Sequence, residues 1–295
     1  DGRLYYSAGS TCNFCLESDA RRAAVTRFES DGTGESLFAR GLRNTVGMAF
    51  HPSTGELWSV DNGGDGLGDN DPPEEINILR EGADYGWPDC RADRLGVNWG
   101  LQARPSRCGP TEPPAVQLPA HSAPLGISFY SGEIFPSSWR DNAIVGLHGS
   151  WNRSQPTGYK VVRIGPGGVE DLLTGCLDSA SRTTSCRPVH AVTGSDGALY
   201  VSDDMQGQIY RIAYLGPRIN PGGIVAVIPR VYELYGRNLA ADPSQFAVYA
   251  NGVQAELLYA SPGQVNFVLP EGISGEVTIA VKNERAVDQV VINVE

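Results

Sequence analysis

Four short units of similar composition recur along the chain, and they constrain its fold more than any other feature. Each has a Gly or Asx turn, then a short alternating apolar strand that ends on small or acidic residues. The units are DGRLYYSAGS (1–10), TGELWSVDNG (54–63), DNAIVGLHGS (141–150) and DGALYVSDDM (196–205). Repeats of this length, built from short antiparallel strands, predict the blades of a β-propeller. We therefore expect an all-β fold.

The interval between the second and third units is longer than the others. It contains the Pro- and Gly-rich segment 86–124, which we interpret as a loop insertion held by Cys90 and Cys108. The composition changes again at 215–223, where LGPRINPGG is typical of a linker. Beyond it, 224–295 has strand-like runs and turn signals at roughly 8–12-residue spacing, which predicts a small β-sandwich. The expected domains are thus 1–214 and 224–295.

Charge and hydropathy exclude several classes of partner. The formal net charge is −11 and is spread over the whole chain, with no run of Lys or Arg that would form a footprint for nucleic acid or anionic lipid. No apolar run approaches the roughly 20 residues that span a bilayer. We expect no nucleic-acid partner and no membrane span.

The six cysteines fall into local pairs, which are Cys12/Cys15, Cys90/Cys108 and Cys176/Cys186. An even count at short separations favours disulfides in an oxidising compartment. The CxxC at 12–15 leaves a redox motif or half of a zinc site as alternatives, although no second close pair of zinc ligands accompanies it. A secreted protein carries a signal peptide, yet Asp1 opens directly on a strand-like run, so we expect either a processed chain or a fragment.

Three segments carry a family resemblance. They are GLRNTVGMAFHPSTGELWSVDNG (41–63), EEINILREGADYGWPDC (74–90) and LHGSWNRSQPTGYKVVRI (147–164). Together they resemble the soluble glucose/sorbosone (aldose sugar) dehydrogenases. The resemblance implies a periplasmic or secreted oxidoreductase that oxidises a sugar or sugar aldehyde with pyrroloquinoline quinone (PQQ) and calcium and passes electrons to an external acceptor.

The same resemblance implies a six-bladed propeller, of which residues 1–214 supply about four blade-like units. We expect a propeller that is incomplete at its N-terminus, with a four-bladed ring as the alternative. In the C-terminal region, NGVQAELLYASPGQVNFVLP (251–270) resembles a bacterial Ig-like (TIG-like) module. We expect an accessory or adhesive role for it, because it holds no paired carboxylates, His cluster or nucleophile–base arrangement.

The resemblance also assigns residues to the cofactor site. Arg43 would lie over the quinone, where a guanidinium can stabilise negative charge that develops during hydride transfer, and Asn44 accompanies it. Asn62, Gly63 and Gly64 match the turn that binds the cofactor's calcium, an ion that accepts backbone carbonyl ligands. From the residues alone, an acidic, flexible surface loop is the favoured interpretation of 61–75, and its spacing does not fit an EF-hand.

Further candidates lie in the second half of the propeller. The resemblance implies that His148 and Arg153 line the pocket and that Arg187 binds a cofactor carboxylate. A general base, usually His, must take the substrate hydroxyl proton. In the family that base lies upstream of the strand that opens this chain, so we expect these residues by themselves to be inactive, with His148 and His121 as the substitutes to test first. The competing hypothesis is a secreted propeller without redox chemistry that binds carbohydrate or protein.

Overall fold

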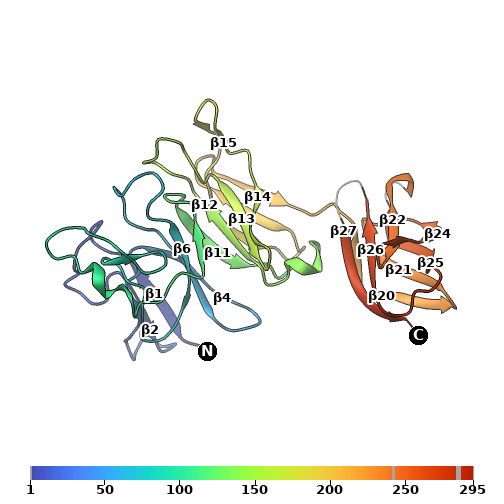
Figure 1. The fold of residues 1–295 in the computed structure, drawn as a ribbon, viewed down its shortest axis with the longest axis horizontal. Coiled ribbons are helices and arrows are strands. Elements are labelled where there is room, and N and C mark those ends of the chain that lie inside the picture. The colour runs from blue at the N-terminus through green and yellow to red at the C-terminus, as the bar shows by residue number, and fades with distance from the viewer. Residues whose placement is uncertain (1, 241–242, 284–286, 295) are drawn as a thin grey trace. The chain divides into compact units, whose positions relative to one another are not determined.

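The computed structural model describes residues 2–240, 243–283 and 287–294, and their regular structure is almost entirely β-strand (Figure 1). The exceptions in this part of the chain are the short 3-10 turns η1 (Pro105–Cys108), η2 (Ser137–Trp139) and η3 (Pro243–Gln245). The all-β prediction is therefore confirmed. The chain divides into two compact units, the first made of 1–131, 141–194 and 199–212, and the second of 132–140, 195–198 and 213–295.

The first unit contains four main sheets, which follow one another along the chain. The first sheet has the order β1 (Leu4–Ala8), β2 (Ala24–Phe28), β3 (Ser36–Arg40), β7 (Ala83–Asp84). The second has the order β10 (Val116–Leu118), β6 (Glu74–Leu79), β5 (Leu57–Asp61), β4 (Thr45–Phe50). The third has the order β11 (Pro124–Phe129), β12 (Ala143–Leu147), β13 (Lys160–Gly165), β14 (Gly168–Leu173). The fourth has the order β17 (Pro188–Thr193), β18 (Leu199–Asp203), β19 (Gln208–Ile212).

Two small hairpins lie outside these sheets. They are β8 (Cys90–Arg91) with β9 (Leu95–Gly96), and β15 (Leu177–Asp178) with β16 (Thr183–Thr184). All pairings in the first unit are antiparallel except that of β3 with β7. The four units predicted from the repeats contain β1, β5, β12 and β18, one strand in each main sheet.

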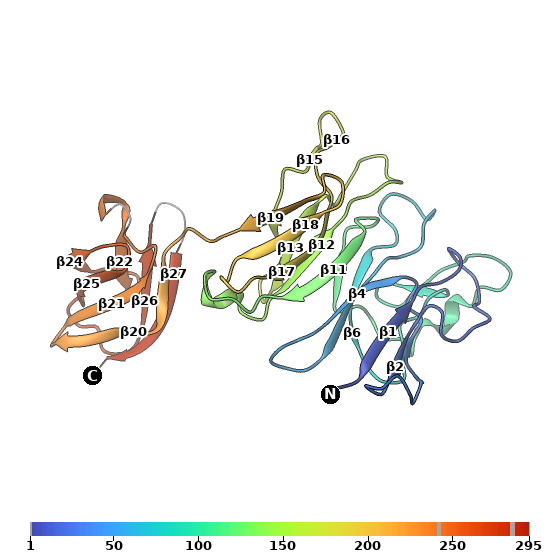
Figure 2. The ribbon, with the colours of Figure 1, turned by 180° about the vertical axis from the view of Figure 1, so that it is seen from behind.

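The main sheets stand side by side through the edge strands β1, β4, β11 and β17, each of which contacts the next in the series (Figure 2). This is how consecutive blades are arranged in a β-propeller. Apolar residues fill the space between sheets, since alternate side chains of each strand face the neighbouring sheet. Val60, Ile76, Val145 and Val162 are almost completely buried in the cluster that joins the second and third sheets.

The three predicted disulfides are confirmed. The bonds join Cys12 to Cys15, Cys90 to Cys108, and Cys176 to Cys186. The second of them closes the insertion and fixes η1 against the hairpin β8–β9, as the Pro- and Gly-rich composition of 86–124 predicted.

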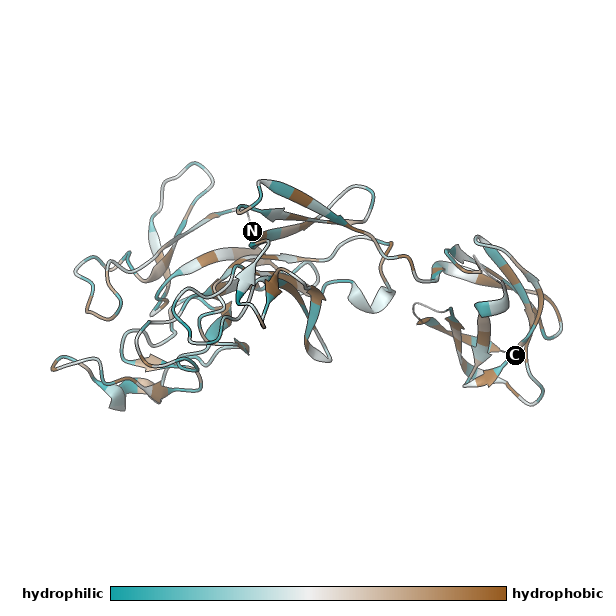
Figure 3. Ribbon diagram, turned by 90° about the horizontal axis from the view of Figure 1, so that it is seen from above, coloured by the Kyte–Doolittle hydropathy of each residue, from teal (hydrophilic) through white to brown (hydrophobic). Residues whose placement is uncertain are grey.

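The second unit is built on two four-stranded antiparallel sheets that enclose one apolar core (Figure 3). One sheet has the order β20 (Arg218–Ile228), β21 (Val231–Arg237), β25 (Gln264–Val268), β24 (Glu256–Ala260). The other has the order β23 (Val253–Gln254), β22 (Ala247–Ala250), β26 (Gly275–Lys282), β27 (Val287–Val294). Leu234 and Phe267 from the first sheet and Val248 and Ile279 from the second are completely buried together.

The range 215–223, expected as a linker, is partly a strand. β20 begins at Arg218, and its pairing with β21 shifts register between Ile219 and Ile224. The sequence Pro221-Gly222-Gly223 that suggested a linker therefore forms an irregularity inside a strand, where Pro and Gly are tolerated.

No helix in the described residues is long and apolar enough to cross a bilayer.

Candidate functional site

The cofactor residues predicted in the second sheet come together because β4 and β5 pair antiparallel. Thr45 at the start of β4 lies opposite Asp61 at the end of β5. Arg43 and Asn44 immediately precede one strand, and Asn62 immediately follows the other. The hairpin thus places the Arg-Asn pair beside the turn predicted to bind calcium.

Asp61 fixes the backbone of this turn. Its carboxylate accepts the backbone N–H groups of Arg43 at 3.1 Å and Asn44 at 2.9 Å, and the Thr45 hydroxyl at 2.9 Å. Burial raises the pKa of Asp61 to about 6 by disfavouring its charged form, while these hydrogen bonds act in the opposite direction. The side chain is a structural support under the site rather than a group exposed to a ligand.

The Arg43 guanidinium is held by two of its three nitrogens. One terminal nitrogen donates to the Asn62 carbonyl at 3.3 Å, and the other lies 3.4 Å from an Asp65 carboxylate oxygen. The side chain is only 17% exposed, and its Nε is buried without a hydrogen-bond partner among the described residues. A buried N–H donor without a partner is rare in folded proteins and calls for an explanation.

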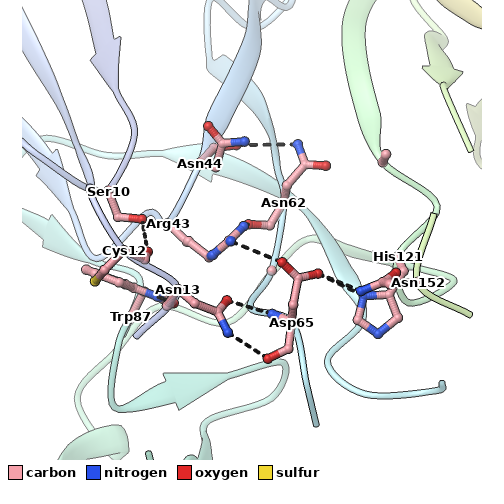
Figure 4. A network of polar contacts seen from close by, with 12 residues as sticks. Ser10, Cys12, Asn13, Arg43, Asn44, Asn62, Asp65, Trp87, His121 and Asn152 are labelled. Atoms are coloured by element: carbon pink, nitrogen blue, oxygen red, sulfur yellow. Dashed lines mark hydrogen bonds and ion pairs between the residues drawn. The ribbon is translucent and has the colours of Figure 1, made fainter. Parts of the chain in front are cut away.

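Asp65 is the centre of the polar network around Arg43 (Figure 4). Its carboxylate accepts the Asn152 side-chain amide at 2.7 Å and lies 3.7 Å from His121 Nδ1. Its backbone N–H and C=O pair with the Asn13 side chain, both at 2.7 Å. The network therefore joins loops from the first three sheets, and Asn152 Oδ1 within it is buried and unpartnered.

The Asn62–Gly64 turn is supported by a buried carboxylate and packed against an aromatic ring. Gly63 N–H donates to Glu74 Oε2 at 2.7 Å. Burial raises the pKa of Glu74 to about 8. A Cβ at Gly64 would lie 2.0 Å from Cζ of Phe14, so only glycine fits under that ring. Neither the Gly63 nor the Gly64 carbonyl accepts a hydrogen bond within the described part of the chain.

The other acids of the loop 61–75 have protein partners and do not gather around one point. Asp69 bonds the backbone and hydroxyl of Ser154, and Asp71 forms a two-point ion pair with Arg91 at 2.6 and 2.7 Å. Glu75 accepts the backbone N–H of residue 92 at 2.8 Å, and burial raises the pKa of Glu75 to about 7. The loop is therefore tied to the protein at several points, and the interpretation as a flexible acidic surface loop does not describe its contacts.

Arg153 lies on the loop between β12 and β13, next to Asn152, and it is fully engaged with the protein. Its guanidinium donates to the carbonyls of Asp69, Ala120 and Gln155 and to the Asn70 side chain. These contacts join the 147–160 loop to the 61–74 loop. In this arrangement Arg153 organises the loops around the Arg43 network. A cofactor carboxylate could bind the Arg153 guanidinium only by displacing the carbonyl oxygens that it now contacts.

Arg187 and His148 form a second group, on the third and fourth sheets. Arg187 donates to the carbonyls of His148 at 3.1 Å and Gly149 at 3.0 Å, and its guanidinium lies over the Tyr159 ring. His148 Nε2 lies 2.9 Å from Asp204, which orients the imidazole. Among the described residues no hydrogen bond or ion pair joins this group to Arg43, and the His148 backbone N–H donates to the Ala123 carbonyl.

The remaining histidines differ in their surroundings. His121 is buried, adopts a left-handed backbone conformation with φ of +61°, and bonds the Gly68 carbonyl at 2.9 Å. His51 accepts two backbone N–H groups of the turn that follows it and packs against Trp58 and Phe129, as expected of a structural residue. His190 lies exposed on β17.

Nothing in the sequence patterns singled out Asp65, Asn13 or Asn152 as site residues. Asp65 is one of several acids in a glycine-rich loop, and nothing local distinguishes it from Asp69 or Asp71. Asn152 offered the better signal, because it sits inside the HGSWNR run that was already of interest. Asn13 lies between the two cysteines of the first disulfide, and only the fold brings it to Asp65.

Comparison with known proteins decides the family. The TrAA12-like family model matches residues 13–214, which is more than half of the chain. The chain belongs to the TrAA12-like family. Its described site residues from Asn13 to Asp204 all lie within the matched range.

Relatives of this TrAA12-like chain include named sugar dehydrogenases. An uncharacterized protein of Borreliella burgdorferi is 38% identical over 222 residues, which is 72% of this chain and 58% of the relative. The aldose sugar dehydrogenase YliI of Escherichia coli is 29% identical over 63% of this chain and 46% of its own length. The pyrroloquinoline quinone-dependent pyranose dehydrogenase of Coprinopsis cinerea is 29% identical over 61% and 32%, respectively. The TrAA12-like chain thus spans less than two thirds of the length of these relatives.

Solved structures agree with the fold. The holo form of the pyranose dehydrogenase PQQ domain from Coprinopsis cinerea superposes with a TM-score of 0.61 at 25% identity, over 72% of this chain and 67% of that one. A calcium structure of the AA12 enzyme from Trichoderma reesei gives a TM-score of 0.61 at 22% identity, over 71% and 64%. The second likeness is evidence of shared fold alone.

Proposed function

We propose that the protein is an oxidoreductase that oxidises a sugar or sugar aldehyde, with PQQ as cofactor and calcium bound beside it, and that it passes electrons to an external acceptor. Its family and its named relatives support this activity. The three disulfides fit a periplasmic or secreted location. We further propose that the first unit is part of a six-bladed propeller and that the second is an Ig-like accessory module.

The observation that carries the proposal is the arrangement around Arg43. Its Nε is a buried donor without a partner, and Asn152 Oδ1 is a buried acceptor without one, on the two sides of Asp65. Such atoms are costly unless a ligand completes their hydrogen bonds. The Arg43 Nε–H donor fits a cofactor that carries quinone oxygens and carboxylates, whereas Asn152 Oδ1 needs an N–H or O–H group of the ligand. The cavity that Arg43 lines is only about 20 Å³, so a cofactor that reaches the buried Nε would have to displace neighbouring side chains.

The carbonyl oxygens of Asn62, Gly63 and Gly64 would hold the calcium ion. Those of Gly63 and Gly64 accept no hydrogen bond from described residues, and backbone carbonyls are ligands that calcium accepts. Glu74 holds this turn from below through the Gly63 N–H. The chemistry that PQQ would supply at this site is the two-electron oxidation of the substrate.

The chain's own residues would then position the substrate and manage charge. The Arg43 guanidinium would stabilise negative charge on a neighbouring ligand oxygen. Among the described residues, His148 is the imidazole best placed to accept a proton, because Asp204 orients its ring. Arg153 and Arg187 would preserve the loop geometry, and would bind cofactor carboxylates only by exchanging their present carbonyl partners.

We also propose that these 295 residues alone turn over poorly, because His148 makes no contact with the Arg43 network and the site is built on part of a propeller. The test is sugar-dependent dye reduction with added PQQ and calcium, measured for the 295-residue chain and for any longer gene product that contains it. Turnover by the longer protein with an aldose or aldehyde supports the activity. Absence of turnover with every aldose, aldehyde and alcohol, despite bound PQQ, would refute it.

The competing proposal is a secreted propeller that binds carbohydrate or protein and has no redox chemistry. The engagement of Arg153 and Arg187 with backbone carbonyls favours it, because neither guanidinium is free for a cofactor carboxylate. Calorimetry separates the two functions. A binding module takes up glycan and shows no affinity for PQQ, whereas the proposed enzyme binds PQQ in the presence of calcium.

A further inference from the structure

A cavity of about 740 Å³ lies beside the disulfide-closed insertion of the first unit, outside the Arg43 network. It is bounded by the end of β6, the 82–90 segment and the 104–112 segment. The bond between Cys90 and Cys108 holds two of these walls together. Its volume is in the range of pockets that bind small organic molecules and is larger than a simple anion requires.

The charges in this cavity are not evenly matched. Arg40 pairs with Asp84 at 3.0 Å, and Arg80 pairs with Glu112 at 2.9 Å. The remaining lining carboxylate on this side, Glu81, is taken by a two-point contact with an arginine outside the cavity. These groups therefore leave no excess charge of their own.

Arg104 and Arg107 give the cavity an excess of positive charge. Both face the single buried carboxylate of Asp89, at 3.6 and 3.9 Å, distances too long for hydrogen bonds. One oxygen of Asp89, Oδ1, accepts the Trp99 indole N–H and the Arg104 backbone N–H, and the other, Oδ2, is the oxygen nearest the two guanidinium groups. Within the described part of the chain neither guanidinium makes a hydrogen bond, and about half of each is exposed. Two guanidinium forks are thus available for a carboxylate.

The other lining groups suit a saccharide. Trp87 lies between this cavity and the small cavity beside Arg43, and its indole N–H is already given to the Asn13 carbonyl. A ligand would therefore meet the apolar ring of Trp87 rather than its polar N–H. Asp84 and Glu112 keep acceptor capacity beyond their arginine contacts, because an ionised carboxylate has about four lone-pair sites. Hydroxyl groups of a sugar can donate to them.

We propose that this cavity binds a saccharide that carries a carboxylate, such as a chain of uronic acid residues. The carboxylate pairs with Arg104 and Arg107, the sugar ring packs on Trp87, and the hydroxyls reach Asp84 and Glu112. The site does not depend on the proposed redox function, since it can be filled with or without PQQ.

The test is isothermal titration of the 295-residue chain with a trimer of galacturonic acid, its uncharged methyl ester, and inorganic phosphate. We expect the acid trimer to bind at least tenfold more tightly than the ester or phosphate, and binding to weaken as salt is raised. This comparison uses wild-type protein and needs no variant to fold. Equal affinity for the ester would refute the carboxylate contact, and equal affinity for phosphate would reduce the cavity to a simple anion site.

Variants locate the binding. The double substitution Arg104→Gln/Arg107→Gln should weaken trimer binding at least tenfold, and Trp87→Ala should weaken the trimer more than phosphate. Arg22→Gln is the matched control, because Arg22 is an exposed arginine whose guanidinium makes one described hydrogen bond, at 3.5 Å to the Gly9 carbonyl. Circular dichroism melts check that each variant is folded. Unchanged affinity in a folded double variant would overturn the proposal, whatever the outcome with PQQ.

Discussion

The Asp61 carboxylate accepts the backbone N–H of Arg43 at 3.1 Å and so fixes the backbone of the turn without using the Arg43 guanidinium. The turn is anchored from the strand side, while Asp65 and the Asn62 carbonyl orient the side chain. The buried carboxylates Asp61 on β5 and Glu74 on β6 lie beside the half-buried Glu75 on β6, and their protonation couples the geometry of the turn to pH.

The first prediction is that the first unit loses stability as pH rises from 5 to 9. Burial raises the pKa of Asp61 to about 6, of Glu75 to about 7 and of Glu74 to about 8. The folded state thus binds more protons than the unfolded state, and the stabilisation is lost as pH rises through these values. We expect the melting temperature to fall by about 5 °C or more over this range.

Glu74→Gln tests whether the Glu74 carboxylate contributes to this pH dependence. It keeps an acceptor for the Gly63 N–H, and it should flatten the pH dependence between pH 7 and 9. Melting curves recorded at several pH values and fixed ionic strength give the pH dependence of the melting temperature for the wild type and for the variant. A melting temperature that rises with pH, or a slope that the substitution leaves unaltered, would show that these carboxylates are charged in the folded protein.

The second prediction concerns Gly64. Gly64→Ala places a methyl group 2.0 Å from Phe14 Cζ, which forces the ring or the turn to move and should cost about 1–3 kcal/mol of stability. Gly109→Ala is the control, because its Cβ would meet nothing within 4 Å. Urea unfolding of both variants measures the difference. The double substitution Phe14→Ala/Gly64→Ala should cost less than the sum of its parts; strict additivity would mean that the two residues do not touch.

The third prediction ranks two disulfides. Cys90 and Cys108 are 18 residues apart, whereas Cys12 and Cys15 are 3 apart. By loop-closure entropy, removal of the first bond should cost about 3 kcal/mol and removal of the second about 2 kcal/mol. Paired Cys→Ser substitutions, compared by denaturant unfolding, check the order. A larger loss from the 12–15 bond would indicate that contacts around Asn13, rather than chain entropy, dominate.

The strands of the first unit were predictable from the sequence because each blade repeats one local pattern. A turn residue, an alternating strand and a small or acidic end recur at β1, β5, β12 and β18. The disulfides were predictable for a similar reason, since each pairs cysteines that are near neighbours in sequence.

The partners of the site residues were not predictable. Asp65 meets Arg43 and Asn152 only because loops of three sheets converge, and contacts across 22 and 87 residues leave no local signal. Arg153 was expected to line a pocket, but nothing in the sequence shows that carbonyls of Asp69 and Ala120 take its donors. The start of β20 was not predicted because Pro and Gly at 221–223 are a local signal for a loop. In the fold they lie inside the strand, which tolerates them.

The fourth prediction concerns the second unit. Arg218 and Asp288 form an ion pair at 3.1 Å with side chains 10% and 3% exposed, and Asp288 also accepts the Ile219 N–H. Arg218→Met would leave the Asp288 carboxylate buried without its cation and should cost about 3–5 kcal/mol. Arg230→Met, which breaks an exposed pair with Glu271, should cost under about 1 kcal/mol. Thermal unfolding measures both, and similar losses would show that the Arg218 pair is solvated.

The central claim is that Arg43 contributes to a PQQ site on this chain, and equilibrium titration of PQQ in the presence of calcium tests it most directly. We predict saturable binding to the 295-residue chain, at least about tenfold weaker binding to Arg43→Ala, and unchanged binding to the control Arg22→Gln. Removal of calcium with a chelator should weaken binding to the wild type. No binding to the wild type, or equal affinity in a folded Arg43→Ala variant, would contradict the account.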